Sequence, residues 1–239
     1  MKKDLPYIKY IGHRGKLKIY TVDGGYVRTN LDEEFTNFGQ HYRFNCIPEN
    51  EFWLENEATP DERRFFIDHL LVEWKLMKQG HSYDSALTYA SSKERSERAR
   101  SRDSQKILDR SGIPDPAKVH LRLLADSPAV VGTKSGVKIW LIDGRLVRSD
   151  FYIDFTEGGH EFVYDFVPPN EVWLDNDLAV SEYPYVLLHE LFERNNMSKG
   201  MVYPEAHRRA SKLEWSCRHD PKKLVAKLTS YGINPEKLK

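Results

Sequence analysis

The sequence predicts an α+β protein built as a tandem duplication, and two observations support this prediction. The first is self-similarity at a constant offset of 120 positions. Residues 17–29 match 137–149, residues 47–55 match 167–175, and identities spread over 77–98 recur in 197–218. Matches of this length at one offset are typical of an internal repeat. The second is the order within each copy, where strand-like runs come first and helical periodicity follows, as expected for a sheet covered by helices.

The strand-like half of each copy predicts a small antiparallel sheet. Residues 18–22 and 26–29 flank Asp23-Gly24, and Asp-Gly between alternating apolar residues is the strongest short hairpin signal. A third strand is expected at 41–47 and a short fourth at 51–54. The second copy repeats these segments 120 positions later, including Asp143-Gly144.

The helical half predicts two helices joined by a turn, packed as a hairpin on the sheet. In the second copy this segment is 186–218, with the turn at Gly200 and the second helix opening near Pro204. The predicted organisation has four parts: a first α+β unit at 7–100, a basic helical linker at 101–127, a second unit at 128–218, and a C-terminal helix and tail at 219–239.

Composition limits the partners and the compartment. Lys plus Arg equals Asp plus Glu at 36 each, so no overall charge attracts the chain to nucleic acid or to an anionic membrane. No stretch reaches the roughly 20 apolar residues that cross a bilayer, and residues 1–6 lack the apolar run of a secretory signal. Cys46 and Cys217 have no C-x-x-C partner, which is typical of reduced thiols. We therefore expect a cytoplasmic protein with no membrane partner.

One local patch leaves a nucleic-acid partner open. Residues 91–110 are rich in Arg, Ser and Lys, and residues 93–110 within them could form a phosphate-binding helix. Acidic residues are interleaved throughout this stretch, which favours a solvated extension of the preceding helix.

The residues that could carry chemistry cluster in the predicted helix hairpin of the second copy. His189 and Glu193 are four apart, so on a helix they lie on the same face. His207 and Glu214 are two turns apart on the second helix and also share a face. If the two helices pack antiparallel, these two imidazoles and two carboxylates converge. Histidine nitrogen and carboxylate oxygen are common ligands of divalent metals.

Residues 189–193 read H-E-L-F-E, a pattern that resembles the H-E-x-x-H helix of the zincin metallopeptidases. Glu193 stands where that family has its second histidine, and Glu214 follows where one branch has a glutamate ligand. The resemblance implies His189 and Glu193 as metal ligands, Glu214 or His207 as the third, and Glu190 as the general base. It implies zinc as the first expectation, with manganese or iron as alternatives because Glu193 is a carboxylate. The implied activity is hydrolysis, with a peptide or protein as the first substrate class and ester or phosphoester bonds as alternatives.

The first copy serves as an internal control. It keeps His69, Glu73 and Glu94 where the second copy has the His189, Glu193 and Glu214 set. It has Leu70 and Leu87 where the second copy has Glu190 and His207.

Two interpretations follow from this comparison. In one, the second copy is a metal-dependent hydrolase and the first is degenerate. In the other, the shared residues form a structural network in a non-catalytic interaction protein, since buried carboxylates need partners. His160 is a reserve ligand from the sheet, and His41 is expected to correspond to it across a one-residue gap.

Overall fold

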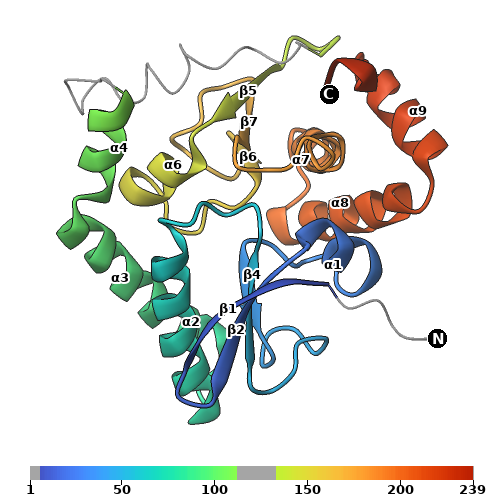
Figure 1. The fold of residues 1–239 in the computed structure, drawn as a ribbon. Helices are drawn as coiled ribbons and strands as arrows, with labels where there is room; N and C mark the ends of the chain where they lie inside the picture. Colours follow the sequence, from blue (N-terminus) through green and yellow to red (C-terminus); the bar gives the residue numbers. More distant parts are fainter. Residues whose placement is uncertain (1–5, 112–132, 239) are drawn as a thin grey trace. The chain divides into compact units, whose positions relative to one another are not determined.

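The computed structural model describes residues 6–111 and 133–238. They form two compact units: the first contains residues up to 107 together with Arg148–Asp154, and the second contains the rest. Each has a small sheet and packed helices (Figure 1), so the predicted α+β class is confirmed.

Both sheets are mixed rather than purely antiparallel. The first has the order β1-β2-β4-β3, and its strands are β1 (Tyr7–Arg14), β2 (Leu17–Val22), β3 (Phe38–Gln40) and β4 (Glu51–Glu55). The second has the order β5-β7-β6, and its strands are β5 (Lys138–Ile142), β6 (Gly158–His160) and β7 (Glu171–Asp175). The pairs β2/β4 and β5/β7 are parallel, whereas β1/β2, β3/β4 and β6/β7 are antiparallel.

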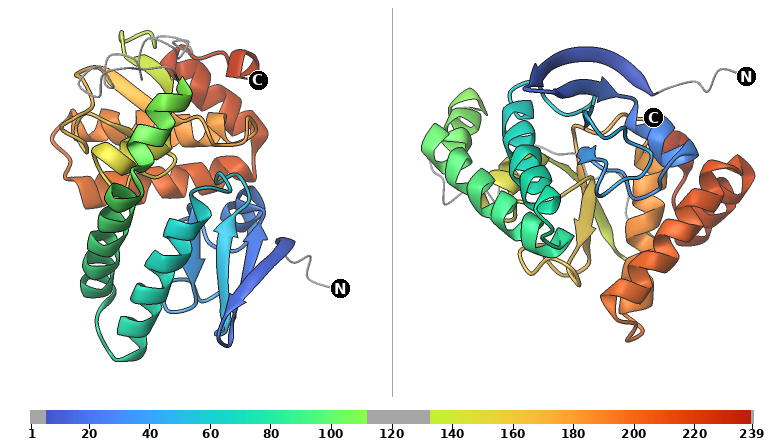
Figure 2. Two further views of the ribbon diagram at one scale, coloured as in Figure 1. Left: turned by 60° about the vertical axis from the view of Figure 1, so that its left-hand side comes forward. Right: turned by 90° about the horizontal axis from the view of Figure 1, so that it is seen from below.

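The helices repeat in the same order in the two copies. The first copy has α1 (Gly24–Asn30), α2 (Arg63–Lys78) and α3 (Tyr83–Ser101), followed by α4 (Asp103–Ser111). The second has α6 (Gly144–Asp150), α7 (Tyr183–Met197) and α8 (Tyr203–Arg218), followed by α9 (Pro221–Tyr231) and a 3₁₀ turn (Pro235–Leu238). Figure 2 shows α2 and α3 side by side, joined by a short turn. The rest of the predicted linker, 112–127, lies outside the described residues.

The predicted hairpins at Asp23-Gly24 and Asp143-Gly144 are wrong, because both dipeptides start helices. The Asp23 carboxylate accepts a hydrogen bond from the Tyr26 N–H at 2.8 Å, which is an N-cap. Gly24 is needed for space, since a Cβ there would overlap the Glu55 carboxylate. The expected strand at 26–29 is therefore part of α1, which begins the crossover that a parallel strand pair requires.

The predicted third strands at 41–47 and 161–167 are also wrong. These residues form successive turns, and the strand lies just before them, in β3 and β6. The short fourth strands are confirmed as β4 and β7. Because β6 ends at His160, this histidine faces the helix hairpin from the edge of the sheet.

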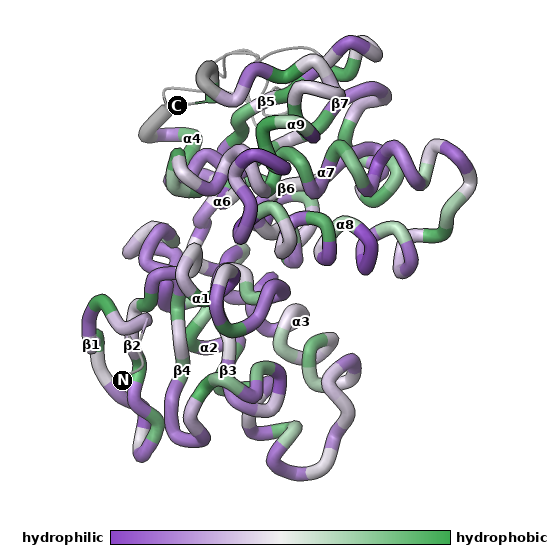
Figure 3. Tube along the Cα trace, turned by 90° about the vertical axis from the view of Figure 1, so that its right-hand side faces the viewer, coloured by the Kyte–Doolittle hydropathy of each residue, from purple (hydrophilic) through white to green (hydrophobic). Residues whose placement is uncertain are grey.

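The helix hairpins are confirmed in both copies. Gly80 and Gly200 follow α2 and α7 with φ of 91° and 90°, a backbone region where glycine has no Cβ penalty. In the second unit, α7 packs on the sheet through Leu187, Leu188 and Leu191, which share one buried cluster with residues of β5, β7 and α9. Figure 3 shows hydrophobic and hydrophilic residues alternating along the helices, as expected where one face is buried.

No helix in the described ranges 6–111 and 133–238 is long and apolar enough to cross a bilayer. Cys46 and Cys217 are both free thiols.

Candidate metal centre

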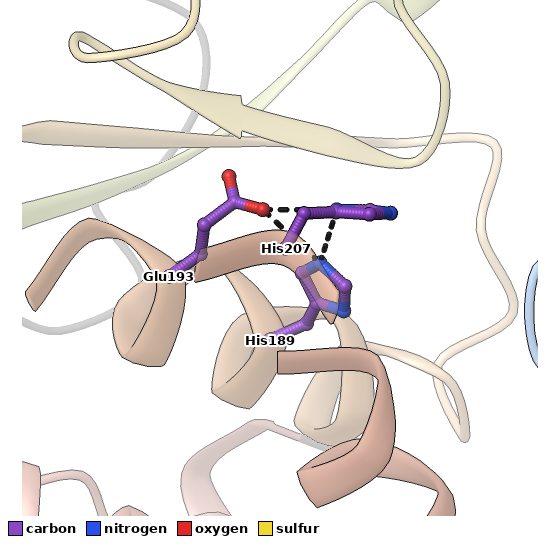
Figure 4. A group of neighbouring side chains, drawn as sticks. All are labelled: His189, Glu193 and His207. Carbon is purple, nitrogen blue, oxygen red and sulfur yellow. Dashed lines mark hydrogen bonds and ion pairs between the residues drawn. The ribbon is translucent and has the colours of Figure 1, made fainter. Parts of the chain in front are cut away.

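Three side chains of the α7–α8 hairpin converge on one point. His189 and Glu193 come from α7 at i and i+4, and His207 comes from the first turns of α8, which lies against α7 (Figure 4). Two of the contacts are hydrogen bonds: His207 Nδ1 lies 2.9 Å from Glu193 Oε2 and 3.2 Å from His189 Nε2. The third side of the triangle, His189 Nε2 to Glu193 Oε2, is 3.6 Å.

This triangle has the dimensions of a metal-ligand set. With metal–ligand bonds of about 2.0–2.1 Å, two ligand atoms of a tetrahedral site lie about 3.3 Å apart. The observed separations of 2.9, 3.2 and 3.6 Å surround that value. We call His189, Glu193 and His207 the ligand triad. It can hold a divalent cation through one imidazole nitrogen from each histidine and one carboxylate oxygen.

Glu214 lies on the other side of the His189 ring from the triad. Its Oε2 accepts from His189 Nδ1 at 2.9 Å, and its Oε1 accepts from Arg218 Nε at 3.0 Å. Arg218 in turn donates to both carboxylate oxygens of Glu182, at 3.2 and 2.7 Å. We call the series His189–Glu214–Arg218–Glu182 the backing chain. Among the four residues suggested as ligands by the sequence, Glu214 alone is placed to orient a ligand rather than to join it.

The backing chain fixes which His189 nitrogen faces the triad. Burial alone would lower the pKa of His189, but hydrogen bonds to Glu193 and Glu214 raise it well above its usual value. Burial alone would raise the pKa of Glu214, but His189 and Arg218 lower it to about 2. Glu214 is therefore a carboxylate that holds the proton on Nδ1. A ligating histidine commonly has such a carboxylate partner on its second nitrogen.

His160 approaches Glu193 from the sheet. Its Nε2 lies 3.0 Å from Glu193 Oε1, the carboxylate oxygen that points away from the other two histidines. The His160 ring is completely buried. Burial alone would raise the pKa of Glu193, but the hydrogen bonds from His160, His189 and His207 lower it well below its usual value.

Glu190 lies beside the triad, and its carboxylate makes no hydrogen bond to the described residues. It is adjacent to His189 on α7, so its side chain points in a different direction, toward Gly158 at the start of β6. Only 9% of it is exposed. Burial, opposed by His189 and reinforced by Glu193, raises its pKa to about 7. One of its oxygens can join Glu193 and His160 in a second group of close potential ligand atoms.

Exposure increases from the inside of the site to its outer edge. The side chain of Glu193 is 3% exposed, that of His189 is 12% exposed and that of His207 is 35% exposed. Solvent therefore reaches the triad on the His207 side. His207 is therefore the member of the triad most exposed to solvent.

The first copy reproduces the backing chain. His69 Nδ1 lies 2.8 Å from Glu94 Oε2, and Arg98 donates to Glu94 at 2.9 Å and to Glu62 at 2.7 Å. The matching distances in the second copy differ by no more than 0.1 Å. A chain of buried charges retained in both copies has a structural role, because each member would otherwise be a buried charge without a partner.

The first copy does not reproduce the triad. Leu87 occupies the place of His207, and His69 Nε2 is a buried nitrogen without a hydrogen-bond partner among the described residues. At 3.7 Å, Glu73 acts on this nitrogen as a charge rather than as an acceptor. Burial alone would lower the pKa of His69, but Glu73 and Glu94 raise it to about 9.

The expected correspondence between His41 and His160 is wrong. Gln40 pairs with Phe52 in the first sheet as His160 pairs with Val172 in the second, so Gln40 is the counterpart and no gap is needed. Its Nε2 donates to Glu73 Oε1 at 2.6 Å. Sequence reasoning missed this because histidine was matched to histidine rather than position to position.

Sequence reasoning did not assign Arg218 and Glu182 to the site. It could have found them because both are identical in the first copy, where they are Arg98 and Glu62.

No protein-family model matches this chain, and no match was found among the curated proteins or the solved structures.

Proposed function

We propose that the second unit is a metal-dependent hydrolase that binds one divalent cation through His189, Glu193 and His207. The observation that carries this proposal is the triangle of ligand atoms, with sides of 2.9, 3.2 and 3.6 Å. Zinc fits a set of two imidazoles and one carboxylate, and manganese and iron are the alternatives for the same donors.

The surroundings of the triad support catalysis rather than storage of a cation. The backing chain holds His189 with Nε2 toward the triad, and His207 leaves the site accessible to solvent. A cation held by these residues would supply Lewis acidity, which polarises a water molecule or a scissile carbonyl or phosphoryl group.

Glu190 is the proposed general base. It takes a proton from the attacking water while the water oxygen bonds to the carbonyl carbon or the phosphorus. The bond from that atom to the leaving group then breaks, and Glu190 gives the proton to the leaving group. The Glu190 carboxylate lies close to Glu193 and makes no hydrogen bond to another described side chain, so it can accept a proton from water at the triad. A peptide bond is the first substrate class because of the resemblance of residues 189–193 to the zincin helix, and ester and phosphoester bonds follow.

Glu190→Gln is expected to abolish turnover while leaving the metal content nearly unchanged. Removal of a general base typically lowers a rate by about 10²- to 10⁴-fold. Purified wild type, loaded with Zn²⁺, Mn²⁺ or Fe²⁺, is assayed against casein, a p-nitrophenyl ester and bis(p-nitrophenyl) phosphate. We expect hydrolysis of one class that stops with chelator and in Glu190→Gln. Equal turnover in the two proteins would refute the role of Glu190, and no metal-dependent turnover on any class would refute the hydrolase proposal.

A second candidate is a non-catalytic interaction protein, and one observation favours it. The backing chain is present in the first copy, where Glu190 and His207 have only leucine counterparts, so it serves structure there. The first candidate additionally explains why Glu190 and His207, which stand in place of those two leucines, both lie at the triad of the second unit. The two candidates separate on metal binding, which only the hydrolase requires.

A further inference from the structure

We propose that His160 is not a metal ligand but a fixed hydrogen-bond donor that positions Glu193 within the ligand triad. This inference rests on the proposed metal site and assigns the role of the third histidine that contacts Glu193. Four acid and base groups crowd around Glu193, and distance alone does not separate ligand from support. The direction of the hydrogen bonds distinguishes a ligand from a supporting group.

The backbone determines the His160 tautomer. The N–H of Phe162 donates to His160 Nδ1 at 3.2 Å, so Nδ1 is an acceptor and carries no proton. The proton is therefore on Nε2, which faces Glu193 Oε1 at 3.0 Å. A carboxylate can only accept, so this bond runs from His160 to Glu193.

That arrangement prevents His160 from binding a cation. Binding through Nε2 requires its lone pair, and the ring proton would then move to Nδ1. There it would point at the N–H of Phe162, placing two donors against each other within 3.2 Å. Phe162 lies in the turn that follows β6, and this turn is held by hydrogen bonds from the Val163 and Tyr164 N–H groups to the His160 carbonyl, both at 3.0 Å. Reversing the Phe162 N–H would require a change in the backbone of this turn.

The first copy has the same pair of hydrogen bonds, made there by Gln40. The N–H of Tyr42 donates to Gln40 Oε1 at 2.7 Å, and Gln40 Nε2 donates to Glu73 Oε1 at 2.6 Å. A glutamine side chain has one acceptor and one donor group, which are the two functions assigned to His160. It offers no imidazole nitrogen, so its occurrence at this position points to hydrogen bonding as the role of the site.

The consequence lies in the orientation of Glu193. With Oε1 held by His160, Oε2 faces His189 and His207 and is the oxygen available to a cation. His160 is thus a positioning residue, and its effect reaches the cation through Glu193.

The first test needs no metal. The ring ¹⁵N shifts of His160, assigned by comparison with His160→Gln, should show a protonated Nε2 and an unprotonated Nδ1. A proton on Nδ1 would overturn the proposal.

The second test is rescue by the conservative variant. In competition with a chromogenic chelator, His160→Ala should bind Zn²⁺ about 10- to 100-fold more weakly than wild type, whereas His160→Gln stays within about threefold. Gln40→Ala, which removes the same donor from the first copy, is the matched control and should leave Zn²⁺ affinity unchanged. Equal losses in His160→Gln and His160→Ala would identify His160 as a ligand and overturn the proposal.

The two proposals fail separately. If wild type binds none of Zn²⁺, Mn²⁺ and Fe²⁺, the metal site is refuted. The His160 tautomer and the unfolding midpoints of the two variants then still decide the role of His160. A donor role predicts that His160→Gln unfolds close to wild type and that His160→Ala unfolds earlier. The reverse order, or equal midpoints for the two variants, would contradict it.

Discussion

His207→Leu should lower the affinity for Zn²⁺ by more than about 100-fold. Loss of a second-shell partner typically costs about 10- to 100-fold, and His207 is a direct member of the triad, so its removal should exceed that range. Leucine is the residue that the first copy has at the equivalent position, Leu87, so the helix accepts it. Isothermal titration with Zn²⁺ in wild type and variant measures the difference.

The control for His207→Leu is a histidine outside the site. His81 is exposed in the turn before α3, and His81→Leu should bind Zn²⁺ as wild type does. The metal site would be contradicted if His207→Leu kept the affinity of wild type, or if both variants lost the same amount.

Leu87→His should create a second metal site in the first copy. The change places an imidazole where the second copy has His207, next to His69 Nε2, which has no hydrogen-bond partner among the described residues. Glu73 is already oriented by Gln40, and His69 is already held by Glu94 at 2.8 Å. Three ligands from one helix hairpin are then present, so the Zn²⁺ content should rise from one to two equivalents per chain, measured by mass spectrometry of the loaded protein.

Leu87→Gln is the matched control, because it adds a polar side chain of similar length without an imidazole. It should leave the content at one equivalent. A second variant, His69→Asn in the Leu87→His background, should return the content to one. A folded Leu87→His protein that still binds one equivalent would show that the geometry of the triad does not suffice for binding.

The sequence allowed the repeat, the α+β class and the helix hairpins to be predicted, because each rests on a local or periodic signal. The offset of 120 is visible by comparison alone, and Gly80 and Gly200 mark the turns. The sheet was harder, because Asp-Gly is typical of both a hairpin and a helix N-cap. The helix that follows Asp23 contacts residues far along the chain: Glu55 fills the space beside Gly24 and pairs with Arg28 at 2.8 Å.

The members of the candidate site were predicted from local spacing, but their separate roles were not. Spacing on a helix placed His189 and Glu193 on one face, and the hairpin brought His207 to them. Which groups could bind a cation and which hold those groups in place could not be read from spacing. The roles of Glu214 and His160 depend on which nitrogen of a ring meets which partner, and that is set by packing between elements.

The most direct measurement of the central claim is the number of metal ions bound per chain. Wild type is purified without chelator, loaded in turn with Zn²⁺, Mn²⁺ and Fe²⁺, desalted and analysed by elemental mass spectrometry, alongside His189→Ala. The ligand triad predicts one ion per chain in wild type and none in His189→Ala. No bound ion in wild type, or the same content in His189→Ala, would contradict it.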